Sequence, residues 1–155
     1  MTNLEQNLMN TIRQTLTHDT PDANVYAIFN VSTDDYFSAY SAEIFVKTGS
    51  DIQDTQKLIE PAQWQSLLGV LSEPLQAIYD NQQHFDYLIV GHDEHGQFTF
   101  KYENNVDMTL FERFVVWEYD EFGIGRRKAP LIKLNFGKRA MPLRTSVLDK
   151  YRPVN

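Results

Sequence analysis

The chain contains no cysteine among its 155 residues. This absence excludes a disulfide framework, catalysis by a thiol, and thiolate-bound zinc or iron–sulfur centres. No segment approaches the roughly 20 apolar residues that a membrane-spanning helix requires. The N-terminus also lacks the basic start and the apolar run of a secretory signal. From these absences we expect a cytoplasmic protein that does not bind a membrane.

The sequence also lacks the short motifs that indicate common enzyme chemistry. Gly123-Ile124-Gly125 is followed by basic residues and not by the glycine pattern of a phosphate-binding loop. No serine lies in a nucleophile elbow, and adjacent acids such as Asp34-Asp35 are usually only solvated charge. His92-Asp93-Glu94-His95 offers ligand types that zinc or nickel uses, but one hairpin loop binds a metal weakly without distant ligands. We therefore expect no enzyme, no cofactor and no metal site.

Basic residues are scarce over most of the chain. Residues 1–124 hold five basic and 20 acidic residues, a net charge of −15. Residues 125–155 hold nine basic residues against Asp149 alone, a net charge of +8. An acidic body repels nucleic acid and attracts basic protein surfaces, although net negative charge also serves solubility alone. The basic tail either folds back on the body or contacts something anionic.

The pattern of apolar residues predicts the elements in chain order. Thr2-Asn3-Leu4-Glu5 has capping-box spacing and begins a helix that extends to about Thr17. Residues 24–31 and 36–47 alternate as two strands joined by residues 32–35. We expect a short edge strand over 56–60 and a long core helix from Pro61 to Asn81. An interior Pro74 predicts a kink or break of that helix near residues 71–74.

A second hairpin and a further helix follow. Residues 87–90 and 97–102 are rich in β-branched and aromatic residues, and a polar loop that ends at Gly96 joins them. Phe98, Phe100 and Tyr102 share one face of the second strand. Thr109-Leu110-Phe111-Glu112 has capping-box spacing, and Gly123 suits the end of the helix that follows. We expect this helix to lie on the hairpin.

These elements predict an α+β fold with the order α-β-β-(β)-α-β-β-α. Two hairpins would build an antiparallel sheet, with the helices packed on one face. We expect a single domain over residues 1–125 and a partly ordered basic extension over residues 126–155 packed on the same domain. Within the extension, residues 131–136 suit a strand, residues 137–143 a loop, and residues 146–151 a short helical turn.

The element order and several aromatic patterns resemble the YezG-like antitoxin (immunity) family. The patterns are Val25-Tyr26-Ala27, a helix that bears Trp64, the sequence Phe98-x-Phe100-x-Tyr102, and Phe111-Glu112-Arg113 followed by Trp117, Tyr119 and Phe122-Gly123. The resemblance covers most of residues 2–124. Pro74 and the basic residues after Gly125 depart from the family pattern.

The resemblance implies a non-catalytic immunity protein that binds and neutralises the toxic C-terminal domain of a secreted bacterial toxin. Several such domains are nucleases, which tend to present basic clefts, so an acidic inhibitor is the expected partner. We predict that acids of the hairpin loop and of the last helix supply the binding surface, with Tyr119 as an aromatic anchor. The predicted partner-binding residues are Asp93, Glu94, Glu103, Asp107, Glu118, Tyr119, Asp120 and Glu121.

Two other functional classes remain open from the sequence. A small-ligand-binding or enzymatic α+β domain would need a pocket with converging polar groups. A nucleic-acid-associated protein would use the basic clusters at residues 126–128 and 138–139. The immunity interpretation excludes nucleic acid as a partner and names the toxin domain instead.

Overall fold

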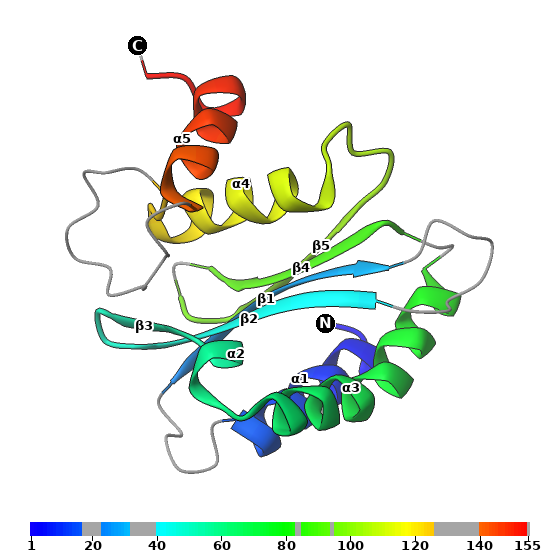
Figure 1. Ribbon diagram of the computed structural model, residues 1–155. Helices are drawn as coiled ribbons and strands as arrows, with labels where there is room; N and C mark the ends of the chain where they lie inside the picture. The colour runs from blue at the N-terminus through cyan, green and yellow to red at the C-terminus, as the bar shows by residue number, and fades with distance from the viewer. Residues whose placement is uncertain (17–22, 32–39, 83–84, 94, 126–139, 155) are drawn as a thin grey trace. The chain divides into compact units, whose positions relative to one another are not determined.

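The computed structural model describes residues 1–16, 23–31, 40–82, 85–93, 95–125 and 140–154. In it the chain forms two compact units, Met1–Val106 and Asp107–Asn155 (Figure 1). We call them unit 1 and unit 2. Helices combine with a five-stranded antiparallel sheet, which confirms the predicted α+β class.

Unit 1 is built on the sheet, whose strand order is β3-β2-β1-β4-β5. Every neighbouring pair is antiparallel. The first strand in the chain therefore lies in the middle, and each hairpin extends the sheet on one side of it. The strands are β1 (Asn24–Val31), β2 (Tyr40–Thr48), β3 (Asp51–Asp54), β4 (Tyr87–His92) and β5 (Phe98–Glu103).

One face of the sheet is covered by two helices, α1 (Asn3–Leu16) and α3 (Pro61–Asn81), which lie side by side (Figure 1). Alternating residues of β1 point to this face because successive strand side chains point to opposite sides. They pack with the apolar stripes of both helices into a core of 18 buried residues. The opposite face also carries buried apolar side chains, among them Ile28 and Ile89.

The predicted start of the first helix is confirmed by its capping box. The Thr2 hydroxyl accepts a hydrogen bond from the Glu5 backbone N–H at 3.1 Å, and the Glu5 carboxylate accepts one from the Thr2 N–H at 2.8 Å. Glu5 is only 6% exposed, and its second oxygen accepts a hydrogen bond from the Tyr102 hydroxyl at 2.6 Å. One buried carboxylate thus fixes the N-terminal helix to strand β5.

The predicted edge strand exists but lies earlier than expected. Strand β3 occupies Asp51–Asp54, and Thr55–Leu58 forms the short helix α2 where the strand over 56–60 was predicted to begin. The reason is local, because the Asp54 side chain accepts a hydrogen bond from the Gln56 backbone N–H and caps that helix.

Helix α3 continues through Pro74, so the predicted break is wrong. An interior proline costs about 3 kcal/mol because it removes one backbone hydrogen bond. Leu71, Pro74, Leu75 and Ile78 are all buried on the side that faces the core, and this packing offsets the cost. The Tyr40 hydroxyl also donates a hydrogen bond to the Leu68 carbonyl and fastens the helix to strand β2.

Unit 2 contains helix α4 (Leu110–Phe122) and helix α5 (Ala140–Tyr151), which contact each other. The capping box of Thr109 and Glu112 and the left-handed Gly123 bound α4 as predicted. Val115 and Val116 of α4 form a small buried cluster with Val147 and Leu148 of α5. The predicted position of α4 on the hairpin stays a prediction.

The predictions for the tail are corrected in part. Helix α5 begins at Ala140, so the end of the predicted loop at residues 140–143 is helical, and the predicted turn at 146–151 belongs to a longer helix. The predicted strand at 131–136 and the loop at 32–35 lie outside the described residues. None of the helices in the described ranges has the length and the apolar character needed to cross a membrane.

Candidate protein-binding surface

The hairpin between β4 and β5 is organised by Asp93. Its carboxylate oxygen Oδ1 accepts hydrogen bonds from the backbone N–H groups of His95, at 2.8 Å, and Gln97, at 2.9 Å. The Asp93 N–H donates to the Gln97 carbonyl and closes the loop at the strand ends. The remaining carboxylate surface is exposed, so Asp93 both holds the loop and presents a charge.

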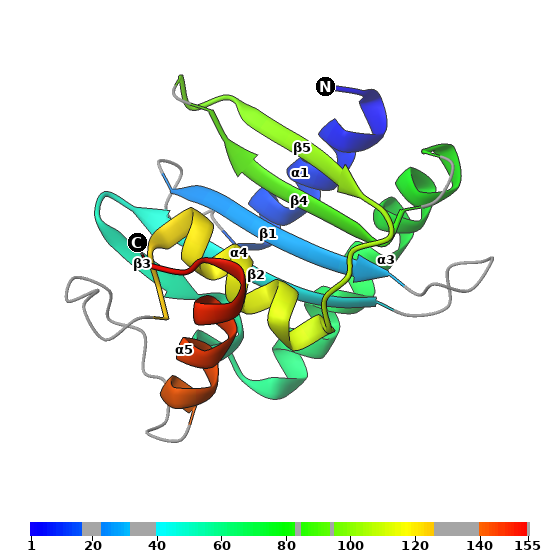
Figure 2. The same cartoon turned by 90° about the horizontal axis from the view of Figure 1, so that it is seen from above.

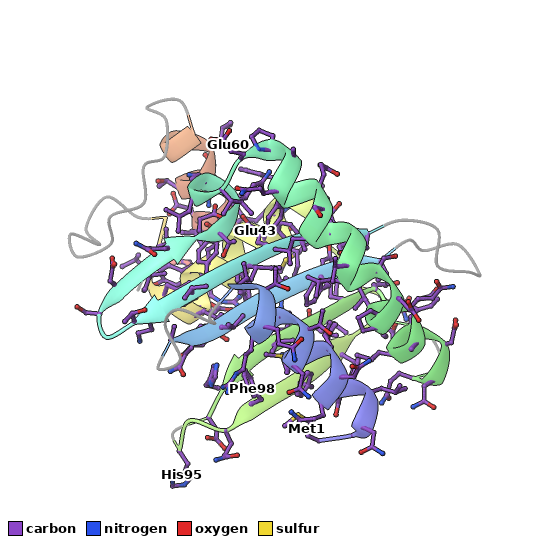
Figure 3. The ribbon with its side chains drawn as sticks, turned by 90° about the horizontal axis from the view of Figure 1, so that it is seen from below. Met1, Glu43, Glu60, His95 and Phe98 are labelled. Carbon is purple, nitrogen blue, oxygen red and sulfur yellow. The ribbon has the colours of Figure 1, made fainter. Side chains whose placement is uncertain are left out.

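The two histidines of this loop differ in surroundings. His92 lies with one ring nitrogen 3.0 Å from the Val25 carbonyl and the other 3.3 Å from the Gly96 carbonyl, and its ring contacts Phe98. His95 points outward at the tip of the hairpin (Figure 3). Among the described residues no three potential ligands gather in a geometry that would hold a metal ion. Glu94 lies outside the described residues.

Glu103 ends strand β5 on the face opposite to the α1–α3 helices. Its carboxylate lies 3.3 Å from the Lys101 ammonium, and its own side chain is 17% exposed. The nearby Asp86 carboxylate accepts a hydrogen bond from the Asn105 N–H at 2.8 Å, which fixes the left-handed turn after the strand. Of the predicted residues in unit 1, Asp93 and Glu103 thus lie at opposite ends of one hairpin.

Glu118 of α4 is buried and ion-paired. Its side chain is 1% exposed and lies 2.8 Å from the Arg144 guanidinium of α5, which is 13% exposed. The carboxylate therefore joins the two helices of unit 2 and presents almost no surface to a partner. Periodicity placed Glu118 on the helix correctly, but only the position of Arg144, 26 residues later, reveals its burial.

Two further basic residues of α5 and its end pair with acids of α4. Arg152 makes a two-pronged contact with Asp120, with nitrogen–oxygen distances of 2.9 and 2.8 Å. Asp120 raises the pKa of the Arg152 guanidinium through this hydrogen bond. Glu112 accepts hydrogen bonds from the Thr109 N–H and the Tyr151 hydroxyl. These bonds lower the pKa of its carboxyl, and the bond from Thr109 has the largest effect. The Lys150 ammonium lies 3.8 Å from the same carboxylate.

The other predicted residues of unit 2 vary in exposure. Asp107 precedes α4 and is exposed, and Glu121 near the end of α4 is exposed as well. Tyr119 is partly buried against the cluster of Val115, Val116, Val147 and Leu148. The tail cations thus compensate part of the acidity that the sequence places on α4.

The charge is divided unequally between the two units. Unit 1 holds 15 of the 21 acidic residues and four of the 14 basic ones, a net charge of −11, whereas unit 2 holds six acidic and ten basic residues, a net charge of +4. No lysine or arginine occurs from residue 58 to residue 100, a stretch with six acids. That stretch forms α3, β4 and the hairpin loop.

Sequence reasoning missed the acids of α3. Glu60 lies at the N-terminal end of the helix (Figure 3), and Glu73 and Asp80 are exposed along it. Their spacing of seven residues places Glu73 and Asp80 on the same side of the helix. The signal that could have revealed this surface was the long stretch without a basic residue, not any motif.

No protein-family model matches the chain, and no curated protein shows significant similarity to it. The functional argument therefore depends on the residues and their surroundings.

Proposed function

We propose that the protein is a non-catalytic immunity protein that neutralises a cognate secreted toxin domain of the nuclease class through the acidic surface of unit 1. The observation that carries the proposal is the net charge of −11 on unit 1, with no basic residue between positions 58 and 100. Exposed acids of that unit include Asp51, Glu60, Glu73, Asp80 and Asp93. The resemblance to the YezG-like family supplies the class of partner.

A nuclease is the toxin that suits such a surface. An enzyme that cleaves a polyanion concentrates basic side chains around its cleft, and opposite net charges accelerate diffusional encounter. The same charge on unit 1 repels nucleic acid, so the inhibitor does not bind the substrate of the nuclease. In unit 2, Glu118 pairs with Arg144 and Asp120 pairs with Arg152, so these two acids contribute less to attraction at long range.

The first experiment is affinity capture of the tagged full-length chain from its native cells. Co-purifying proteins are identified by mass spectrometry, released under denaturing conditions, renatured, and assayed for nuclease activity with and without added chain. The expected result is a stoichiometric partner whose activity disappears when the chain is added back. Recovery of the chain alone, or of a partner whose activity is unaffected, would contradict the proposal.

With the partner in hand, neutral substitutions locate the surface. Three pairs are compared by stopped-flow association at low and high salt: Asp93→Asn with Glu103→Gln, Glu73→Gln with Asp80→Asn, and Asp107→Asn with Glu121→Gln. The pair that belongs to the interface slows association and flattens its salt dependence. Asp93→Asn keeps the acceptor oxygen that holds the hairpin loop, so a slower rate reports charge and not a loosened loop. Gln76→Asn, an exposed neutral change on α3, is the control.

A further inference from the structure

Among the strands of the described residues, β5 has a neighbour on one side alone. It is the last strand of the sheet in that part of the chain, as Figure 2 shows. The Asp93 N–H donates to the Gln97 carbonyl, and bonding alternates along an antiparallel ladder. Thr99, Lys101 and Glu103 therefore direct their N–H and C=O groups toward β4, and the Glu103 carbonyl indeed accepts from the Asp86 N–H.

The outward backbone groups belong to the three aromatic residues of the strand. By the same alternation Phe98, Phe100 and Tyr102 direct three N–H and three C=O groups to the open edge. Their rings pack on the core of unit 1 but stay partly exposed. An added strand would satisfy the backbone groups and cover the rest of these rings at once.

The usual protections of a sheet edge are weak on β5. Natural edges carry unpaired lysines, prolines or bulges that prevent pairing with another chain. β5 contains no proline, and its one lysine, Lys101, lies 3.3 Å from the Glu103 carboxylate, which reduces its repulsive effect. The edge is thus suited to strand addition.

The charge around the edge selects the occupant. Residues 85–106, which form the hairpin and its flanks, contain four acids and one base. Together with the net charge of −11 on unit 1, this repels a second copy of the chain and attracts a cationic segment. We propose that the β5 edge receives an extended cationic segment of the protein partner, which pairs antiparallel with β5 as a sixth strand. The partner's identity as a toxin rests on the proposed function, whereas the strand addition does not.

The register specifies the chemistry of that segment. In the added segment, the residues whose backbone groups bond to β5 place their side chains beside Phe98, Phe100 and Tyr102. These residues of the segment should therefore be apolar. The alternate residues lie beside Thr99, Lys101 and Glu103, and a basic residue there can pair with Glu103. The segment therefore alternates apolar and basic residues.

The test uses a capped hexapeptide of alternating valine and arginine and the ¹⁵N-labelled full-length chain. Amide hydrogen exchange is measured residue by residue by NMR. With peptide at about ten times its dissociation constant, exchange of the Phe98, Phe100 and Tyr102 amides should slow about tenfold, because only the free chain exchanges. The Thr99 and Lys101 amides, already bonded within the sheet, should not change.

Two matched peptides test the pairing itself. Methylation of the valine backbone nitrogens removes the N–H groups that face β5 and should abolish the protection of the three amides. Methylation of the arginine backbone nitrogens, which face away from β5, should leave that protection unchanged. Equal behaviour of the two, or no saturable protection at the three amides, would overturn the strand addition. Equal binding of a glutamate–valine peptide would overturn the cationic occupant. Protection that rises with chain concentration alone would assign the edge to a second copy.

The captured toxin complex separates this inference from the proposed function. If the toxin is inhibited while the three amides exchange as in the free chain, the immunity function stands and the strand addition fails. If the peptide protects the edge but no toxin is recovered, the edge remains a binding site and the proposed function fails.

Discussion

Glu118 combines a negative charge with almost complete burial. A carboxylate loses its hydration when it is buried, and the loss is compensated only if a partner of opposite charge is well placed. Arg144 provides that partner at 2.8 Å. The pair therefore specifies how α5 is placed along α4, and removal of one member takes this buried ionic contact from the other.

We expect Glu118→Ala to lower the stability of unit 2 by about 3–5 kcal/mol, the range for breaking a buried ion pair. Urea denaturation followed by Trp117 fluorescence measures the change. The double variant Glu118→Leu with Arg144→Met should recover much of the loss, since apolar residues of similar size need no partner. Asp107→Asn, at an exposed acid of the same unit, should change little. Additive losses in the double variant would show that the two residues act independently.

The protonation of the Tyr102 hydroxyl is tied to the fold. Burial, and then its hydrogen bond to Glu5, raise the pKa of its hydroxyl well above the ordinary 10.0. The folded chain keeps the proton in a range where the unfolded chain loses it. The stabilising effect is thus complete below pH 10 and is lost as the pH rises further.

The free energy of unfolding should therefore fall steeply above about pH 10, and less steeply in Tyr102→Phe. At neutral pH the variant should lose about 1.5–3 kcal/mol, because the buried Glu5 carboxylate loses a hydrogen-bond donor. Urea titrations from pH 7 to about pH 11, followed by Trp64 fluorescence, test both statements. Glu5→Gln can keep one oxygen as the acceptor for the Thr2 N–H and donate its amide N–H to the Tyr102 hydroxyl oxygen, so it should cost less. If the unchanged chain and Tyr102→Phe had identical profiles of stability against pH, the linkage would be contradicted.

At the scale of elements, helix α3 carries a glycine with no evident structural need. Gly69 lies in the exposed middle of the helix, and a Cβ built on it meets nothing within 4 Å among the described residues. Gly123, in contrast, ends α4 with a φ of 71°, in the left-handed region that favours glycine. The same substitution should have opposite effects at the two positions.

We expect Gly69→Ala to stabilise unit 1 by about 0.5–1 kcal/mol, because alanine loses less backbone entropy in a helix. Gly123→Ala should destabilise unit 2 by about 1 kcal/mol, because a Cβ strains the left-handed conformation. Thermal unfolding followed by circular dichroism and tryptophan fluorescence measures both. Equal signs at the two positions would contradict the assignment of Gly123 as the helix cap.

The elements that the sequence predicted well are those bounded by local signals. The capping boxes at Thr2 and Thr109 set the starts of α1 and α4, and each needs only residues three apart. The position of β3 was missed because Asp54 both ends the strand and caps the helix that follows, and its bond to the Gln56 N–H is not visible in the apolar pattern. Strand order and the burial of Glu118 were not predictable, since both depend on contacts between distant segments.

At the scale of the whole molecule, the two units differ in the size of their cores. The main cluster of unit 1 has 18 buried residues, and that of unit 2 has four among the residues described. Buried apolar area is the main source of stability, so unit 2 should be the weaker. Each unit has one of the two tryptophans, Trp64 in α3 and Trp117 in α4.

This distribution gives a direct test. The single-tryptophan variants Trp64→Phe and Trp117→Phe report each unit separately during urea denaturation. We expect the transition reported by Trp117 to occur at lower urea than the one reported by Trp64. Coincident transitions in both variants would show that the units unfold as one cooperative system.

The central place of β1 has a consequence during synthesis on the ribosome. β1 is complete at Val31, but β4, which pairs with its second edge, begins only at Tyr87, 56 residues later. At about 5–20 residues per second the ribosome needs roughly 3–11 seconds to reach it. For that interval the strand that becomes the middle of the sheet is an open edge on the nascent chain. Translation speed between residues 31 and 87, rather than any property of the finished protein, then determines how long that edge stays open.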